Sequence, residues 1–136
     1  MNIINRNQVL DFVTRNGFNL QYVSLEFQNE NHEIVLAAVN NIGLALEYAS
    51  PELQNDREIV LAAVNNIALS LEFASPELQN DREIVLTAIK QNSYALQYVD
   101  QNLHNYWNNK KNYLLSRDIS NNILNEYFTK SITKFL

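Results

Sequence analysis

Residues 31–55 read NHEIVLAAVNNIGLALEYASPELQN, and residues 56–80 read DREIVLAAVNNIALSLEFASPELQN. The two stretches are identical at 20 of 25 positions, which identifies a tandem repeat. Residues 81–105 open with the six letters DREIVL and then diverge, and the same pattern occurs upstream, with a short insertion before the second unit. We therefore divide the first part of the chain into four units, at 1–30, 31–55, 56–80 and 81–105.

Each unit is predicted to begin with a helix. In the third unit, apolar residues recur on one arc of a helix, at Ile59, Val60, Ala63, Val64 and Ile67. Asn55 or Asp56 is expected to cap this helix, and Asn55-x-x-Glu58 has the spacing of a capping box. The helix should therefore lie mostly buried between neighbouring units.

A second, shorter helix is expected after the weak helix formers Asn65 and Asn66, from about Ala68 to Ala74. Ser75-Pro76 then predicts one further helical turn. Helices this short are marginal alone and must be held by packing against adjacent copies. The predicted fold is all-α, a short α-solenoid of tandem 25-residue helix-turn-helix repeats with a C-terminal helical cap at residues 106–136.

The recurring string D-R-E-I-V-L-x-A-[VI], followed by L-x-[YF]-A-S, resembles the tandem helical repeat of domain-of-unknown-function family 4116. The resemblance spans residues 8–105. It implies arrays of helical repeats such as occur in protists, bacteria and large DNA viruses, and it implies no assigned activity. The family's Asn-Gly bend is kept at Asn16-Gly17, but Ala68 and Ser93 replace the glycine in the third and fourth units.

Composition narrows the class of protein further. A chain of 136 residues with 46% apolar residues is enough for one domain, and the absence of Cys excludes disulfides. No signal peptide and no run of 18 apolar residues is found, so we expect no membrane span and no secretion by signal peptide. We expect an intracellular, cytoplasmic location or one within a virus particle.

The C-terminal part of the chain differs in charge from the repeats. Residues 106–136 have a net charge of +3, whereas residues 1–105 have a net charge of −8. Apolar residues at 3–4 spacing after Asp118 predict a helix that covers the end of the stack, as terminal repeats require. The alternative is a docking segment, in which Trp107, Lys110 and Lys111 are the candidate contact residues. No nucleic-acid partner is expected, because the overall charge is −5.

Translation by one repeat arranges the glutamates in three columns, and these columns are the candidate partner-binding residues. The columns are Glu33, Glu58 and Glu83; Glu47 and Glu72; and Glu52 and Glu77. They would offer a basic partner a periodic target. The alternative is a solvated face in which Glu58 favours the helix N-terminus and Arg57 and Arg82 offset the charge.

Catalysis has little support in the sequence. His32 and His104 occupy non-equivalent places in their units, Ser50 and Ser75 lie in capping contexts, and no Gly-rich phosphate loop exists. We expect no catalytic residue, cofactor, metal or small-molecule substrate. The favoured function is a non-catalytic protein–protein interaction module, a scaffold or adaptor with an unknown protein partner. The alternatives are a structural component of a virion or larger assembly and, at low weight, an enzyme.

Overall fold

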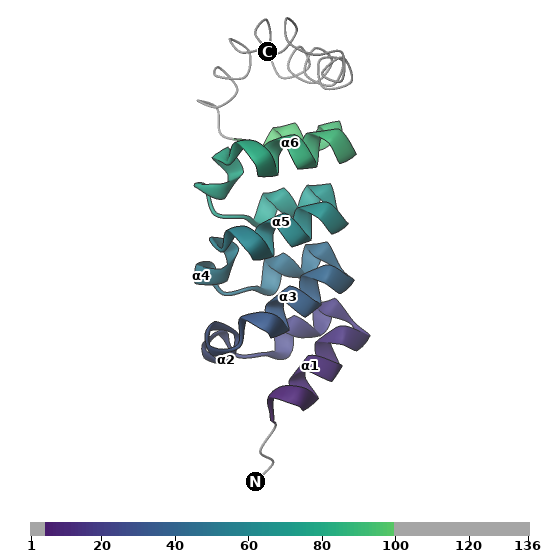
Figure 1. The fold of residues 1–136 in the computed structure, drawn as a ribbon, viewed down its shortest axis with the longest axis vertical. Helices are drawn as coiled ribbons and strands as arrows, with labels where there is room; N and C mark the ends of the chain where they lie inside the picture. The colour runs from purple at the N-terminus through teal and green to yellow at the C-terminus, as the bar shows by residue number, and fades with distance from the viewer. Residues whose placement is uncertain (1–4, 100–136) are drawn as a thin grey trace, which may run out of the picture.

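The computed structural model describes residues 5–99, and in this range it is an all-α stack of repeated units (Figure 1). One long helix begins each unit: α1 (Arg6–Arg15), α3 (His32–Asn41), α5 (Arg57–Asn66) and α6 (Arg82–Gln91). Each is followed by a 3-10 helix: η1 (Gly17–Tyr22), η2 (Gly43–Tyr48), η3 (Ala68–Phe73) and η5 (Ser93–Tyr98). Short segments join consecutive units: α2 (Leu25–Glu30), α4 (Pro51–Gln54) and η4 (Leu78–Asn80). The predicted all-α fold is confirmed, and the predicted cap at 106–136 lies outside the described residues.

The stack has two layers. Consecutive long helices pack on one another, consecutive 3-10 helices pack on one another, and each long helix also packs on the 3-10 helix of the preceding unit. The core between the layers is apolar, and Ile59, Val60, Ala63 and Val64 of α5 are at most 2% exposed. Four residues of the predicted arc are therefore buried, whereas the fifth, Ile67, is the C-cap of α5 and is half-buried.

The second helix of each unit is a 3-10 helix, which the 3.6-residue pattern did not predict. Its buried side includes positions at a period of three residues, Gly43, Leu46 and Ala49, and also Ala45 beside them. The same period places Leu71 and Ala74 in the core of the next unit. Because 3-10 helices longer than four residues are uncommon, packing against the neighbouring units must hold these six-residue examples.

The predicted capping box at Asn55 and Glu58 is wrong. Asp56 is the N-cap of α5, and its side chain accepts a hydrogen bond from the Ile59 amide. The Asn55 side chain instead accepts a hydrogen bond from the Ser75 hydroxyl of the adjoining segment. Asn55 thus links successive turns of the stack.

Glycine at the start of η1 and η2 is explained by close approach and not by backbone conformation. Neither Gly17 nor Gly43 has a positive φ. A Cβ on Gly17 would overlap the carbonyl oxygen of Ala38, and one on Gly43 would overlap that of Ala63. The glycines therefore allow α3 and α5 to pack tightly against the preceding 3-10 helices, η1 and η2.

A side-chain amide at the end of each long helix after the first, α3, α5 and α6, reaches back to the preceding unit. Asn66 Oδ1 accepts from the Gly43 amide at 2.6 Å, and Asn66 Nδ2 donates to the Asn40 carbonyl at 3.3 Å. Asn41 and Gln91 accept in the same way from Gly17 and Ala68. We call this recurring contact the amide clasp. It satisfies an N–H group that the start of a helix otherwise leaves unpaired.

Among the described residues, no helix is long and apolar enough to cross a membrane.

Candidate functional site

A groove runs across the exposed side of the 3-10 layer and encloses about 460 Å³. Its wall comes from equivalent positions of successive units: Phe18, Gln21, Leu44, Glu47, Tyr48, Leu69, Glu72, Phe73 and Tyr98. In η2 the buried positions are Gly43, Ala45 and Leu46, while half-buried Leu44 and exposed Glu47 line the groove. We call this surface the 3-10 groove.

Aromatic side chains form the apolar part of the 3-10 groove. Phe18 and Tyr48 meet edge to face, with ring centroids 6.3 Å apart. Tyr48, Phe73 and Tyr98 occupy the same position in consecutive units, so they form a column along the stack. Edge-to-face pairs and half-buried rings are typical of surfaces that bind apolar groups.

Two glutamates add negative charge to the groove. Glu47 and Glu72 are exposed, and no Lys or Arg of residues 5–99 lines the groove. Partial desolvation, followed by the charge of Glu72 and a hydrogen bond to its carboxylate, raises the pKa of Tyr98. Tyr98 therefore stays protonated as a donor, and the groove combines carboxylates with apolar rings.

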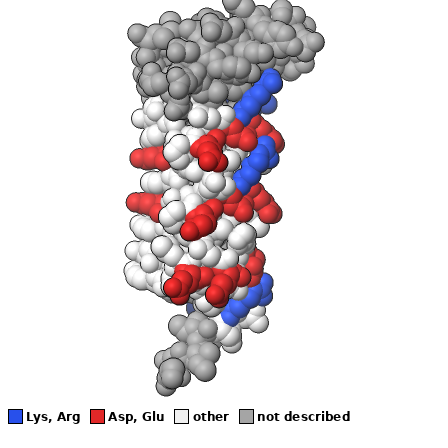
Figure 2. All heavy atoms as spheres, turned by 90° about the vertical axis from the view of Figure 1, so that its left-hand side faces the viewer, with Lys and Arg blue, Asp and Glu red and all other residues white. Residues whose placement is uncertain are grey.

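The first glutamate column is occupied by contacts between units. Arg6 pairs with Glu33, and Arg57 pairs with Asp81 and Glu83 of the next unit. Figure 2 shows acidic side chains recurring up the stack, with basic side chains between them along one edge. The hydrogen bond from Arg6 lowers the pKa of Glu33, and the hydrogen bonds that Arg57 donates to Glu83 and Asp81 raise the pKa of Arg57. In the described ion pairs, Glu33 and Glu83 have arginine partners and the exposed Glu58 has none.

The remaining predicted contact residues are more scattered. Glu52 lies in α4 and Glu77 directly precedes η4; both are exposed, and Glu52 accepts a 3.4 Å hydrogen bond from Asn29. Trp107, Lys110 and Lys111 lie outside the described residues. Glu47 and Glu72 lie in a groove lined by aromatic rings, whereas Glu83 lines a more highly charged hollow together with Arg57, Asp81 and Lys90.

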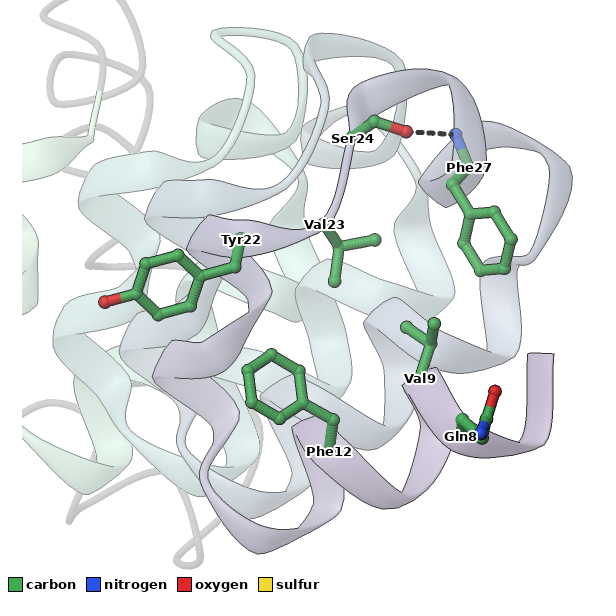
Figure 3. A pocket seen from close by; sticks show the side chains of 7 residues that line it. All are labelled: Gln8, Val9, Phe12, Tyr22, Val23, Ser24 and Phe27. Atoms are coloured by element: carbon green, nitrogen blue, oxygen red, sulfur yellow. Dashed lines mark hydrogen bonds between the residues drawn. The ribbon is translucent and has the colours of Figure 1, made fainter. Parts of the chain in front are cut away.

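A second apolar surface lies on the outer side of the first unit, where a groove of about 550 Å³ is formed by α1, the end of η1 and the start of α2. It is lined by Gln8, Val9, Phe12, Tyr22, Val23, Ser24 and Phe27, whose side chains gather around it in Figure 3. Phe12 and Tyr22 are 41% and 72% exposed, with ring centroids 6.2 Å apart. We call this surface the first-unit face.

The sequence reasoning missed the aromatic column of the 3-10 groove, although a signal for it was present. Tyr22, Tyr48, Phe73 and Tyr98 recur at the repeat period, as do Phe18, Leu44 and Leu69. Large apolar side chains at positions next to a recurring glutamate are consistent with a surface as well as with a core. Only the period of three distinguishes the two, because it assigns Leu46 and not Leu44 to the interior.

The groups considered for chemistry have structural contacts. Ser50 and Ser75 cap the segments that follow them, by accepting from the amides of Leu53 and Leu78. His32 Nδ1 lies 3.7 Å from the Asp56 carboxylate of the next unit. Within residues 5–99, no three side chains of the His, Cys, Asp and Glu types are grouped to hold a metal ion.

Comparison with known families returns one description, Domain of unknown function (DUF4116), which matches at residues 5–54, 31–79 and 56–104. Each match begins one unit after the one before it, so each covers two consecutive units and overlaps the next. The resemblance read from the repeat string is thereby confirmed. No curated protein and no solved structure matches the chain.

Proposed function

Since this chain belongs to the DUF4116 family of unknown function, we propose for it a function that depends on the stacked units themselves, as a non-catalytic protein–protein interaction module. The four units present the 3-10 groove to a segment of a partner protein that carries both basic and apolar side chains. In this role the protein acts as a scaffold or adaptor, and it needs no metal, cofactor or small-molecule substrate.

The observation that supports this proposal is the composition of the 3-10 groove. Glu47 and Glu72 lie beside a column of aromatic rings, with no basic side chain in the lining. A lysine or arginine of a partner can pair with the carboxylates or rest on a ring face, while its aliphatic neighbours cover the apolar wall. Exposed carboxylates bring selectivity and faster association, and burial of the rings brings most of the affinity.

The test is a binding measurement with a defined probe. A library of short peptides with alternating Lys or Arg and aliphatic residues is titrated into the full chain and into the variant Glu47→Gln/Glu72→Gln. We expect binding that weakens roughly 2- to 30-fold in the variant, from the loss of two exposed charge pairs, and that weakens with added salt. The matched control is Glu52→Gln/Glu77→Gln, which removes the same charge from the other exposed column. Equal binding by all three proteins would refute the assignment to this groove.

The second candidate is a structural component of a virion or larger assembly, and the first-unit face favours it. Phe12, Tyr22 and Leu25 expose large apolar side chains at one end of the stack. Such side chains on one face are typical of contact surfaces. Purification of the chain from its native source separates the candidates: recovery at fixed stoichiometry inside a particle supports assembly, and recovery with one soluble partner supports the adaptor. Either result is consistent with the location that we propose, inside the cell or in a virus particle.

A further inference from the structure

The 3-10 groove extends to the point where the described part of the chain ends. Tyr98 lines the groove, and Val99 is the last described residue. An extended chain covers about 3.3–3.6 Å per residue, so Lys110 can lie up to roughly 40 Å from Val99. Packed helices lie about 8–10 Å apart, which puts the units of Glu72 and Glu47 within roughly 20 Å of the fourth unit. The segment after the repeats can therefore reach the whole groove.

This segment does not suit a fifth unit of the stack. Shifted by one repeat from α6, Asn109 and Lys110 fall on the places of Ile84 and Val85. Ile84 and Val85 are completely buried between units, and an unpaired buried lysine or amide is costly there. We therefore do not expect this segment to add a further long helix to the stack.

Its charge and its apolar content complement the groove. Residues 106–136 have a net charge of +3 against −8 for residues 1–105, and Lys110 and Lys111 are adjacent. The groove offers two exposed carboxylates and no basic side chain. Trp107, shortly before the lysine pair, matches the aromatic wall of Phe73 and Tyr98.

We propose that residues 106–111 of this chain dock in the 3-10 groove, with Lys110 and Lys111 paired to Glu72 and Glu47 and Trp107 against the aromatic column. The segment then occupies the site that the proposed function assigns to a partner, and the partner must displace it. Because the segment is tethered, its effective concentration at the groove is on the order of 1 mM. Docking that is weak for a free peptide is therefore enough to regulate binding by a partner.

The absence of cysteine permits a direct test in the full chain. The variant Asn112→Cys is labelled with a nitroxide, and the broadening of backbone amide NMR signals is measured. We expect strong broadening at Leu69, Glu72 and Phe73, and none at Glu58 on the opposite layer. Broadening at the groove should disappear in Lys110→Gln/Lys111→Gln and in Glu47→Gln/Glu72→Gln, and it should persist in the control Glu52→Gln/Glu77→Gln.

The proposal is overturned if the groove signals are not broadened, or if broadening is the same in the glutamine variants. A titration separates this failure from failure of the proposed function. A synthetic peptide of residues 106–116 is added to Lys110→Gln/Lys111→Gln, whose own segment lacks the charges. Binding in the groove, roughly 3- to 10-fold tighter than to the unchanged chain, supports competition by the tethered segment. Equal binding to both proteins supports the groove as a binding site but refutes the docking of residues 106–111 in it. No binding to either protein refutes both the docking and the proposed function.

Discussion

Ser70 lies in the contact between the second and third units, and it is completely buried. Its hydroxyl has no hydrogen-bond partner, whereas the equivalent positions of the neighbouring units are Ala45 and Ala95. A buried hydroxyl without a partner costs about 1–3 kcal/mol relative to its state in water. The same buried position therefore holds an alanine in the second and fourth units and a serine in the third.

We predict that Ser70→Ala stabilises the protein by roughly 1 kcal/mol, because it removes the unsatisfied hydroxyl without leaving a large cavity. The measurement is the free energy of unfolding from urea denaturation. Ser75→Ala is the control of opposite sign: Ser75 accepts from the Leu78 amide and donates to Asn55, so its loss should cost roughly 0.5–2 kcal/mol. A destabilised Ser70→Ala would mean that the hydroxyl has a partner in solution.

Arg57 links two units by charge, and this link should depend on pH. Partial burial raises the pKa of Asp81, but the hydrogen bond from Arg57 and those from the backbone outweigh it, so the pKa is lowered overall from 3.8. A carboxyl whose pKa is lowered by folding stabilises the protein above its ordinary pKa, and the contribution is lost as the pH falls through the lowered value.

We therefore predict that Arg57→Gln is less stable than the unchanged chain at pH 7. Near pH 2 the two proteins should have the same stability. Thermal unfolding followed by circular dichroism at both pH values measures the difference. The pair is largely exposed, so the difference at pH 7 should be small and should shrink with added salt. A difference that persists at pH 2 would show that Arg57 acts by packing and not by charge.

At the scale of the elements, the amide clasp explains why each long helix after the first ends in Asn or Gln. The single residue after the helix is extended, as at Ile67 with φ −139° and ψ 112°, so the chain leaves the helix abruptly. The next helix starts with unpaired N–H groups, and the clasp from the following unit satisfies one of them. The break inside each of the first three units is thus stabilised by the unit after it.

We predict that Asn66→Ala destabilises the protein by roughly 1–3 kcal/mol, because the part-buried Gly43 amide loses its acceptor. Its neighbour provides the control. Asn65 is exposed and contributes its backbone carbonyl to Gln91, which alanine keeps, so Asn65→Ala should change stability by less than about 0.5 kcal/mol. Equal effects of the two substitutions in urea denaturation would refute the clasp.

The same elements show how far the sequence could be used for prediction. The long helices were predictable because ten residues include nearly three turns, enough to identify Ile59, Val60, Ala63 and Val64 as one face. Six residues do not separate a period of three from 3.6, so the pattern alone indicates an ordinary helix for η3. The clasp was not predictable, because an asparagine at a helix end such as Asn66 could equally be a solvent-exposed residue. Its contact with the preceding unit depends on the offset between units, which the sequence does not give. The same offset brings Arg57 to Glu83, whereas the second unit has His32 at the place of Arg57, so no arginine of that unit is paired with Glu58 in the described ion pairs.

At the scale of the whole molecule, the first unit differs from the others where a preceding unit would pack. Phe12 occupies the place of Ala38, Ala63 and Ala88, which are completely buried and lie against the preceding unit. Arg15 occupies the place of the clasp residues and pairs instead with Asp11 in its own helix. The first-unit face thus corresponds to the side of each later unit that packs on the unit before it. On this face the ring of Phe12 stands where close packing requires the methyl group of an alanine.

We therefore predict that the position of an added unit decides its effect. A copy of residues 56–80 inserted after Asn80 meets the usual surfaces on both sides, and stability should rise by roughly 1–4 kcal/mol, the typical share of one folded unit of this length. The same copy placed before Asn5 meets Phe12 and Arg15, and it should add almost nothing. The free energy of unfolding of both variants, together with hydrogen exchange in the added unit, measures this.

The substitutions Phe12→Ala and Arg15→Asn decide whether these two residues stop the stack. Together they restore the small side chain and the clasp acceptor, so in their presence the copy placed before Asn5 should become protected from exchange. Made without the added copy, they should destabilise the chain, because they remove the Phe12–Tyr22 contact and the Asp11 ion pair. If the preceding copy is already protected with Phe12 and Arg15 in place, the first-unit face accepts a further repeat, and its exposed rings do not mark an end of the stack.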